Sequence, residues 1–380
     1  MLETPAMAAK EKEAAAAAEL AELLSPAAGQ AAREGAAEAA LALSGDAAGR
    51  RLLAGQPAAM AALLELAAGP SLPAARHALG CLVNLSAEPA AREPLLAALP
   101  ALLGLLPGGP ACGVLANLCR ERGAARRVLR GLREGGPGLE PLLQALGQPR
   151  PPSQLGPLLC NLSQLPEGRR GLLDRSRCSV QRLLPFTQYQ DSVVHRRGVV
   201  GALRNCCFEY EDHEWLLSEE VDILPFLLLP LAGPEEFPED EMERLPVDLQ
   251  YLPQDKQREE EPDIRKMLLE AIMLMIPSWE ERLVHQRVVL ASRETSPGWR
   301  NGPTRTSWSS LRRRNNLRQQ DAEGNDGLES SSADEALGVL VNATLNVSQQ
   351  HAPVVKAAKG DLGCMRSSVT AGRGTSAQLW

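Results

Sequence analysis

The chain has 380 residues, of which 44% are hydrophobic, and a formal net charge of −7 at pH 7. This length allows a large buried core, and the acidic balance excludes a general attraction to nucleic acid or anionic membranes. The longest apolar stretch, residues 221–232, is interrupted by Asp222, Pro225 and Pro230, so the sequence predicts no membrane-spanning helix.

The first residues combine Ala-rich sequence with the charged run Lys10 to Glu13. A signal peptide would need an uncharged apolar core, so residues 1–14 are predicted to be a flexible N-terminus and the protein to be cytoplasmic. The eight cysteines form no C-x-x-C pair. They are predicted to be reduced, mostly buried thiols, and the sequons at Asn84 and Asn161 are then accidents of sequence.

A short apolar phrase with a central Asn recurs along the first half of the chain. A weaker first copy has Ala42 in place of the Asn, and successive copies are 42, 33, 44 and 44 residues apart. An apolar pair follows each Asn eleven and twelve residues later. This period predicts an all-α, armadillo- or HEAT-like helical solenoid over residues 15–275, a fold that binds other macromolecules. The repeated residues are Asn84, Asn117, Asn161 and Asn205.

An Asn inside an apolar helix needs a partner, because its amide competes for backbone hydrogen bonds. The amide either bonds the neighbouring repeat or lines a groove that grips a bound chain. The position four residues before each Asn lies on the same helix face. This position, termed here the slot, holds a small apolar residue. Armadillo nuclear-import adaptors have Trp there, so the slot favours close packing over peptide binding. Its residues are Gly80, Gly113, Pro157 and Gly201.

Aromatic residues are concentrated between residues 186 and 251, which hold eight of the twelve in the chain, whereas residues 1–185 have none. Aromatic and Arg side chains dominate interface hot spots, so this section is a candidate contact with a protein partner. The alternative is that the later repeats have larger cores. The predicted contact residues are Arg196, Arg197, Arg204, Tyr210 and Trp215.

An acidic segment follows the aromatic section. Residues 233–246 contain three prolines and six carboxylates, which argue against a continuous helix, so residues 233–262 are predicted to form a long loop. An apolar stripe at helical spacing then predicts a helix over residues 263–275.

Composition changes again after Met275. Residues 276–380 are predicted to be a divergent, largely disordered tail that does not complete the solenoid. One isolated repeat-like helix is expected near residues 334–358, around Asn342. Arg312 to Arg314 is a weak nuclear-localisation pattern, for which a solvated basic run is the alternative.

Motifs for catalysis and cofactor binding were not found. The sequence has no phosphate-binding loop, dinucleotide-binding loop or H-E-x-x-H motif, and its five His residues fit no metal spacing. His213 is a candidate general base, or a residue that starts a repeat helix. The sequence therefore predicts no enzyme, no catalytic residue, no cofactor and no metal.

Five segments together resemble one family, the eukaryotic Hgh-one homologs, once called brain protein sixteen. The segments are residues 180–189, 197–208, 213–217, 221–230 and 243–252. The resemblance covers roughly residues 15–275 and ends where the C-terminal tail departs from the family. It implies an armadillo-like chaperone adaptor without catalytic activity. Such an adaptor links newly made elongation factor 2 to the cytosolic chaperonin and aids its folding. Separately, the protein is expected to be a monomer. The alternative is another armadillo-type adaptor, nuclear-transport or ribosome-linked; neither nucleic acid nor membrane is a predicted partner.

Overall fold

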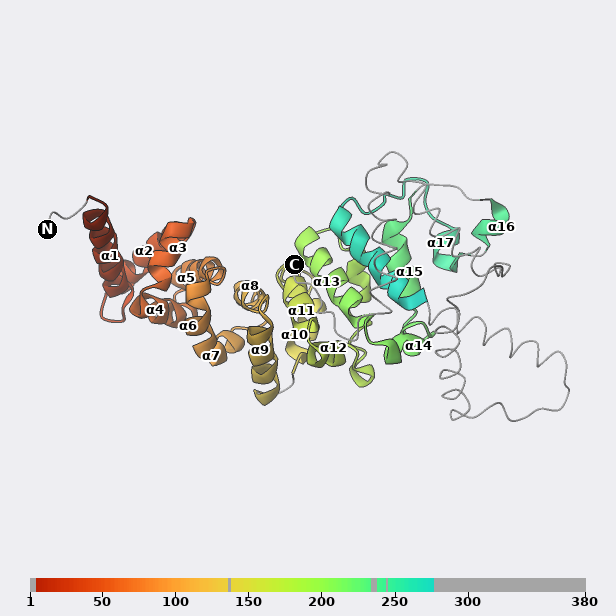
Figure 1. Cartoon of the computed structure of the whole chain (residues 1–380), viewed down its shortest axis with the longest axis horizontal. Helices are drawn as coiled ribbons and strands as arrows, with labels where there is room; N and C mark the ends of the chain where they lie inside the picture. Colours follow the sequence, from red (N-terminus) through yellow and green to blue (C-terminus); the bar gives the residue numbers. More distant parts are fainter. Residues whose placement is uncertain (1–4, 136–137, 234–237, 244, 277–380) are drawn as a thin grey trace, which may run out of the picture. The chain divides into compact units, whose positions relative to one another are not determined.

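The computed structural model describes residues 5–135, 138–233, 238–243 and 245–276. Within these ranges every regular element is helical, as the sequence predicts (Figure 1). The described residues divide into two compact units, one of residues 5–231 and 258–274 and one of residues 232–257 and 275–276. The predicted tail, with its repeat-like phrase at Asn342, lies outside the described residues from position 277 onward.

The first unit begins with α1 (Pro5–Leu24). This helix includes most of the segment 1–14 that the sequence predicts to be flexible. The helix extends that far because the segment is rich in Ala, Glu and Lys, which are strong helix formers.

Each copy of the repeated phrase lies at the C-terminal end of a helix, termed here a ladder helix. Consecutive ladder helices pack against one another, which brings the phrases side by side. The ladder helices are α2 (Gln30–Leu43), α5 (Leu72–Leu85), α8 (Gly109–Leu118), α11 (Leu155–Ser163) and α13 (Val193–Cys206).

Two further elements follow each ladder helix. The second helices carry the apolar pair after each Asn, and Leu95, Leu96, Val128 and Leu129 are buried there. They are α3 (Ala47–Ala54), α6 (Arg92–Ala97), α9 (Arg122–Glu134), α12 (Pro166–Leu172) and α14 (His213–Leu216). The third elements are α4 (Pro57–Ala67), α7 (Leu99–Gly104), α10 (Glu140–Leu146), the 3-10 helix η3 (Leu184–Gln188) and α15 (Ile223–Leu228). Four short 3-10 segments accompany them: η1 (Pro89–Ala91), η2 (Arg175–Arg177), η4 (Tyr210–Asp212) and η5 (Leu229–Leu231).

Local sequence fixes where several of these helices start. The side chain of Asp46 accepts from the Gly49 amide at the start of α3, and Ser192 accepts from the His195 amide at the start of α13. Glu121 accepts from the amides of Gly123 and Ala124 before α9. Each cap satisfies amides that a helix terminus leaves without a partner.

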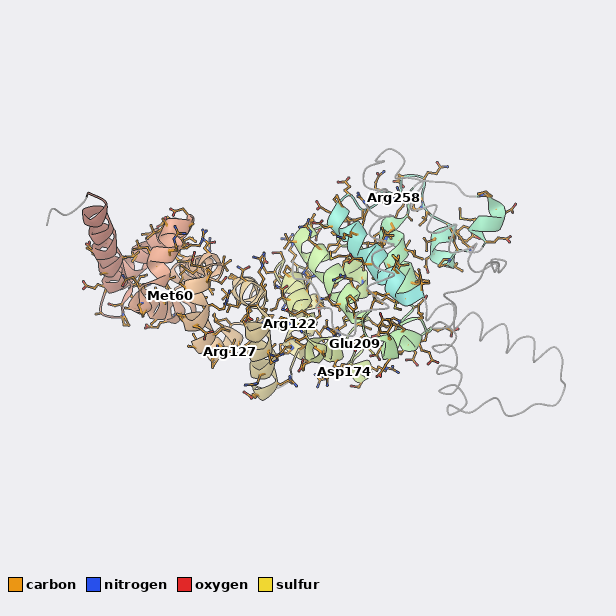
Figure 2. All side chains as sticks on the ribbon, in the orientation of Figure 1. Met60, Arg122, Arg127, Asp174, Glu209 and Arg258 are labelled. Carbon is orange, nitrogen blue, oxygen red and sulfur yellow. The ribbon has the colours of Figure 1, made fainter. Side chains whose placement is uncertain are left out.

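The core of the first unit is aliphatic through residue 184. Leu, Ala and Val predominate among its buried side chains, with Met60 of α4 among the largest, and side chains fill the space between the helices (Figure 2). This agrees with the absence of aromatic residues before Phe186.

The predicted acidic loop belongs to both units. Residues 232–257 form the second unit with α16 (Glu239–Met242) and α17 (Val247–Gln250). Residues 258–262 return to the first unit, where Arg258 Nε donates to Leu231 O at 2.7 Å and the Glu259 amide donates to Pro230 O at 2.8 Å. A helix over residues 262–276 follows, close to the predicted 263–275.

Candidate functional site: the asparagine ladder and its basic end

Each ladder Asn donates a hydrogen bond from its amide nitrogen, Nδ2, to the preceding ladder helix. Asn84 donates to Ser44 Oγ at 2.9 Å, and Asn117 to Ser86 Oγ at 2.9 Å. Asn161 donates to Ala116 O at 2.8 Å, and Asn205 to Ser163 Oγ at 3.0 Å. The amides therefore connect neighbouring repeats, which is the structural alternative that the sequence left open.

The acceptor in three of these bonds is a Ser two residues after the Asn position of the preceding repeat. Ser44, Ser86 and Ser163 each donate their own hydroxyl hydrogen to the backbone carbonyl three residues earlier, at 2.6–2.7 Å. This orientation leaves the hydroxyl lone pairs available to the incoming amide. The first repeat has Ala42 in place of the Asn but has Ser44, which is the acceptor for Asn84 of the second repeat.

The third repeat has Cys119 where the first, second and fourth repeats have this Ser, and the fifth repeat has Cys207. Asn161 bonds a backbone carbonyl instead, and the side chain of Gln164 donates to Cys119 O. Gln164 is buried and belongs to the ladder, although sequence reasoning missed it. The sequence signal for its role was Cys119, because a Cys at this position removes the Ser hydroxyl that accepts the Asn amide in other repeats.

The small residues four positions before the Asn lie where helices approach closely. A Cβ on Gly80 would lie 3.1 Å from Leu41 Cδ1, and one on Gly201 would lie 2.7 Å from Cys160 Sγ. This agrees with the packing role predicted for the slot. Still closer is the crossing of α11 and α13, where a Cβ on Gly198 would overlap the backbone of Gly156 and Pro157.

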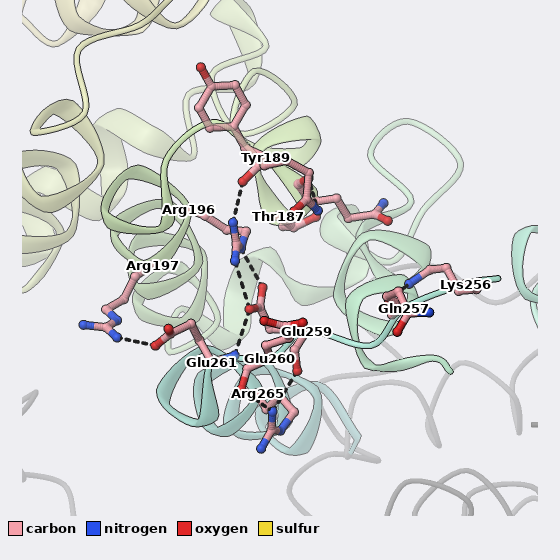
Figure 3. A network of polar contacts seen from close by, with 12 residues as sticks. Thr187, Tyr189, Arg196, Arg197, Lys256, Gln257, Glu259, Glu260, Glu261 and Arg265 are labelled. Atoms are coloured by element: carbon pink, nitrogen blue, oxygen red, sulfur yellow. Dashed lines mark hydrogen bonds and ion pairs between the residues drawn. The ribbon is translucent and has the colours of Figure 1, made fainter. Parts of the chain in front are cut away.

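At α13, which we term the basic end of the ladder, three arginines each pair with a carboxylate. Figure 3 shows the pairs of Arg196 and Arg197. Arg196 bonds Glu259 with both Nε and Nη2, at 2.6 and 3.0 Å, and donates to Tyr189 O at 2.6 Å. Arg197 Nη2 lies 2.7 Å from Glu261, and Arg204 Nε lies 2.7 Å from Glu270. These pairs tie residues 258–270 to α13.

The pair of Arg196 and Glu259 is buried, with side chains 7% and 4% exposed. Burial alone would raise the pKa of Glu259, but the hydrogen bonds from Arg196 and the Glu261 amide, with the charges of Arg196 and Arg265, outweigh it and lower that pKa. Glu259 is therefore held as a carboxylate inside the fold.

The predicted contact residues differ in their surroundings. Arg196 and Trp215 are buried, which corrects their assignment to a partner-facing surface. Trp215 Nε1 donates to Glu220, and the Arg175 guanidinium lies 4.8 Å from its ring centre. Arg204 is half-buried, with its guanidinium 5.3 Å from the Phe208 ring centre.

Two members of the predicted set remain accessible. Tyr210 is 49% exposed, and the Arg197 side chain is 45% exposed. Phe208, which the prediction did not include, is 37% exposed. We term Phe208 and Tyr210 the ladder-end surface; Arg197 lies near the other end of α13.

Burial disfavours the protonated forms of the two histidines in this region. His213 Nε2 donates to Cys207 O at 2.7 Å, and desolvation lowers the pKa of His213. Desolvation also lowers the pKa of His195, whose ring lies against those of Phe186 and Tyr189. His213 is buried at the start of α14, the position that the second alternative expected.

Burial likewise raises the pKa of the ladder thiols, to about 11 for Cys81 and Cys160 and about 12 for Cys112 and Cys207. A protonated thiol is a poor nucleophile. In the described ranges, no cluster of three or more His, Cys, Asp or Glu could hold a metal ion. No helix in the same ranges has the length and hydrophobicity needed to cross a membrane.

Solved structures with a similar backbone are armadillo proteins and engineered proteins. A designed armadillo repeat protein matches 68% of this chain and 98% of its own, with 18% identity and a TM-score of 0.51. An engineered protein matches 69% of this chain and 96% of its own, with 16% identity and a TM-score of 0.53. At these identities the likeness shows the fold alone, an armadillo-like helical stack.

Sequence relatives are closer. Residues 109–266 match a family model described as a domain of unknown function, DUF383. The protein HGH1 homolog of Homo sapiens is 58% identical over 253 residues, covering 62% of this chain and 64% of that protein. The homolog of Xenopus tropicalis is 50% identical over 271 residues, covering 67% and 75%. The chain thus spans about two thirds of the human relative's length. With identities of this size over most of the described solenoid, the chain belongs to the HGH1 homolog family.

Proposed function

We propose that this protein is a non-catalytic adaptor of the cytosol that links newly made elongation factor 2 to the cytosolic chaperonin and aids its folding. Membership in the HGH1 homolog family, with an armadillo-like stack, supports an adaptor role. The observation that carries the proposal on this chain is the ladder-end surface. There, two exposed aromatic side chains flank Glu209 in the sequence, and the guanidinium of Arg204 lies beside the Phe208 ring.

The surroundings of this surface support a binding role. Arg204 holds the ring of Phe208 from one side, and the Tyr210 ring lies 5.0 Å from that of His213. Both aromatic side chains are thus positioned by buried or half-buried neighbours while part of each ring remains in solvent. Pre-positioned aromatic rings lose little conformational entropy on binding, a property of interface hot spots.

The experiment is a pull-down of purified elongation factor 2 on the tagged full chain, with and without chaperonin. Changing Phe208→Ala and Tyr210→Ala together should weaken capture of the factor by at least about tenfold. The matched control is Tyr251→Ala, which removes an aromatic ring that is 83% exposed in the second unit. Arg196 is unsuitable for charge reversal, because its buried ion pair would be broken.

Two results would contradict the proposal. If the parent chain does not capture the factor, the partner is wrong, and capture of ribosomal or nuclear-transport proteins would favour the other adaptor classes. If the parent binds but the double variant and the control bind equally well, the contact lies elsewhere on the chain.

A further inference from the structure

Positive charge is concentrated in one part of the first unit. Residues 120–182 contain 12 arginines and no lysine, against five Asp and Glu residues, although the whole chain has a net charge of −7. Half of these arginines are Arg120 and the five arginines of helix α9. Figure 2 shows two of them, Arg122 and Arg127, on this helix.

The arginines of α9 are ordered by the helical period. Positions 122, 126, 130 and 133 are separated by four, four and three residues, so they share one face. The other face is buried, with Ala124, Ala125, Val128, Leu129 and Leu132 against the core. We term Arg122, Arg126, Arg130 and Arg133 the arginine stripe; its last three members are exposed and Arg122 is half-buried.

The stripe is poorly neutralised within the chain. Beside it, Arg127 pairs with Glu93 at 2.9 Å. In the part of the chain that the structure describes, no ion pair is found for Arg126, Arg130 or Arg133. Like charges one turn apart repel each other and destabilise a helix. The stripe therefore costs the free protein stability, and a bound anionic partner would offset that cost.

A pocket opens at the C-terminal end of the stripe, between α9, α10 and α12. Leu129, Leu132 and Leu143 contribute apolar lining. The charged lining is Arg133, Glu140, Glu167, Asp174 and Arg177. An apolar lining with charged residues fits a hydrophobic side chain that extends from a polar segment.

We propose that the arginine stripe and this pocket form a docking site for an acidic protein segment, with one aliphatic side chain inserted in the pocket and flanking carboxylates paired with the stripe. The guanidinium group presents paired donors that match a carboxylate. A polypeptide fits better than nucleic acid, because residues 1–185 have no aromatic side chain on which a base could stack. The site is separate from the ladder-end surface and does not depend on the proposed function.

The test measures fluorescence anisotropy of a labelled peptide, glutamates around one central leucine, titrated with the full chain. Arg130→Glu with Arg133→Glu should weaken binding at least about tenfold, because it removes two charge pairs and adds repulsion. The matched control, Arg51→Glu with Arg76→Glu, changes two exposed arginines outside the stripe and should change affinity by less than about twofold. A peptide with alanine in place of leucine should bind several-fold more weakly. Circular dichroism should show the same helix content in all variants.

Four results would overturn the proposal in whole or in part. No binding of the leucine peptide by the parent chain rejects the site. Equal losses in the stripe and control variants would mean non-specific attraction. Equal affinities of the leucine and alanine peptides would remove the pocket from the site. A short RNA duplex that binds more tightly than the peptide, with the same sensitivity to stripe reversal, would make the stripe a nucleic-acid surface.

Discussion

Two pairs of ladder helices carry the same repeated phrase in different surroundings. One pair is α5 and α8, and the other is α11 and α13. Asn84 and Asn117 are half-buried, whereas Asn161 and Asn205 are 8% and 5% exposed. At α5 and α8, a Cβ added to Gly80 or Gly113 would first meet the ends of Leu41 and Val83, at 3.1 and 3.3 Å. At the crossing of α11 and α13, an added Cβ would meet backbone.

This difference teaches that one repeat motif can be stabilised in two ways. The earlier repeats rely on aliphatic packing, which tolerates small changes of volume and position. The later repeats add backbone contact, buried amides and the buried pair of Arg196 and Glu259. Charged and backbone groups tolerate little displacement, so we expect substitutions to cost more in the later repeats. The predictions below test that expectation.

The largest effect is expected at Glu259. Glu259→Ala leaves the buried Arg196 charge without its partner and should lower the free energy of unfolding by about 3–5 kcal/mol. The control is Glu261→Ala, which breaks the exposed pair with Arg197 and should cost at most about 1 kcal/mol. Urea denaturation followed by circular dichroism measures both. Equal costs would mean that the buried pair contributes no more than a surface pair.

A smaller loss is expected from a methyl group at the helix crossing. Gly198→Ala forces α11 and α13 apart and should cost about 3 kcal/mol, the upper part of the usual range for overpacking. Gly35→Ala in α2 is the matched change, because no atom lies within 4 Å of the added Cβ, and it should stabilise its helix by about 1 kcal/mol. Opposite signs in thermal unfolding would support the comparison, whereas two stabilised variants would contradict the close crossing.

The ladder itself should show the same gradient. Asn161→Ala leaves Ala116 O without its partner in a buried site and should cost about 1–3 kcal/mol. Asn84→Ala, at a half-buried site, should cost less, about 0.5–1.5 kcal/mol. Hydrogen exchange of α8 and α11 would localise the first loss, and that of α2 and α5 the second. An Asn161→Ala variant of unchanged stability but impaired partner binding would instead make the amide a binding group.

The repeat ladder could be predicted from sequence because its signal is local and periodic. The Asn phrase, the small slot before it and the following apolar pair all recur at nearly fixed offsets, so helix identity and packing followed. The Ser acceptors were visible in the same phrase. Their role needed the distance between neighbouring repeats, which sequence spacing does not supply.

The ion pairs of α13 could not be predicted in this way. Arg196 and Arg197 are adjacent in sequence, yet one is buried and the other is exposed, and their partners lie more than 60 residues later. Residues 258–262 looked like the end of an acidic loop, since nothing local indicates that the chain returns to α13. A segment rich in charged residues has the composition of a solvated loop, whether or not one of its carboxylates becomes buried.

The smallest effect is expected from pH. His195 and His213 both lie in the later repeats, and burial lowers the pKa of each. A His with a lowered folded-state pKa binds its proton more readily when unfolded. The stability that depends on the neutral ring is thus fully present above the ordinary His pKa of 6.5 and is lost as pH falls below it.

The loss of unfolding free energy should not exceed about 1.4 kcal/mol per pH unit for each histidine. The lowered pKa of Glu259 acts in a separate window, below the ordinary Glu value of 4.5. His213→Gln keeps a donor for Cys207 O but does not titrate, so its unfolding free energy should fall less steeply than the parent's between about pH 6.5 and 5. Hydrogen exchange should place the parent's loss in α13 and α14 rather than in α5 and α8. The same slope in parent and variant would mean that His213 contributes nothing to it.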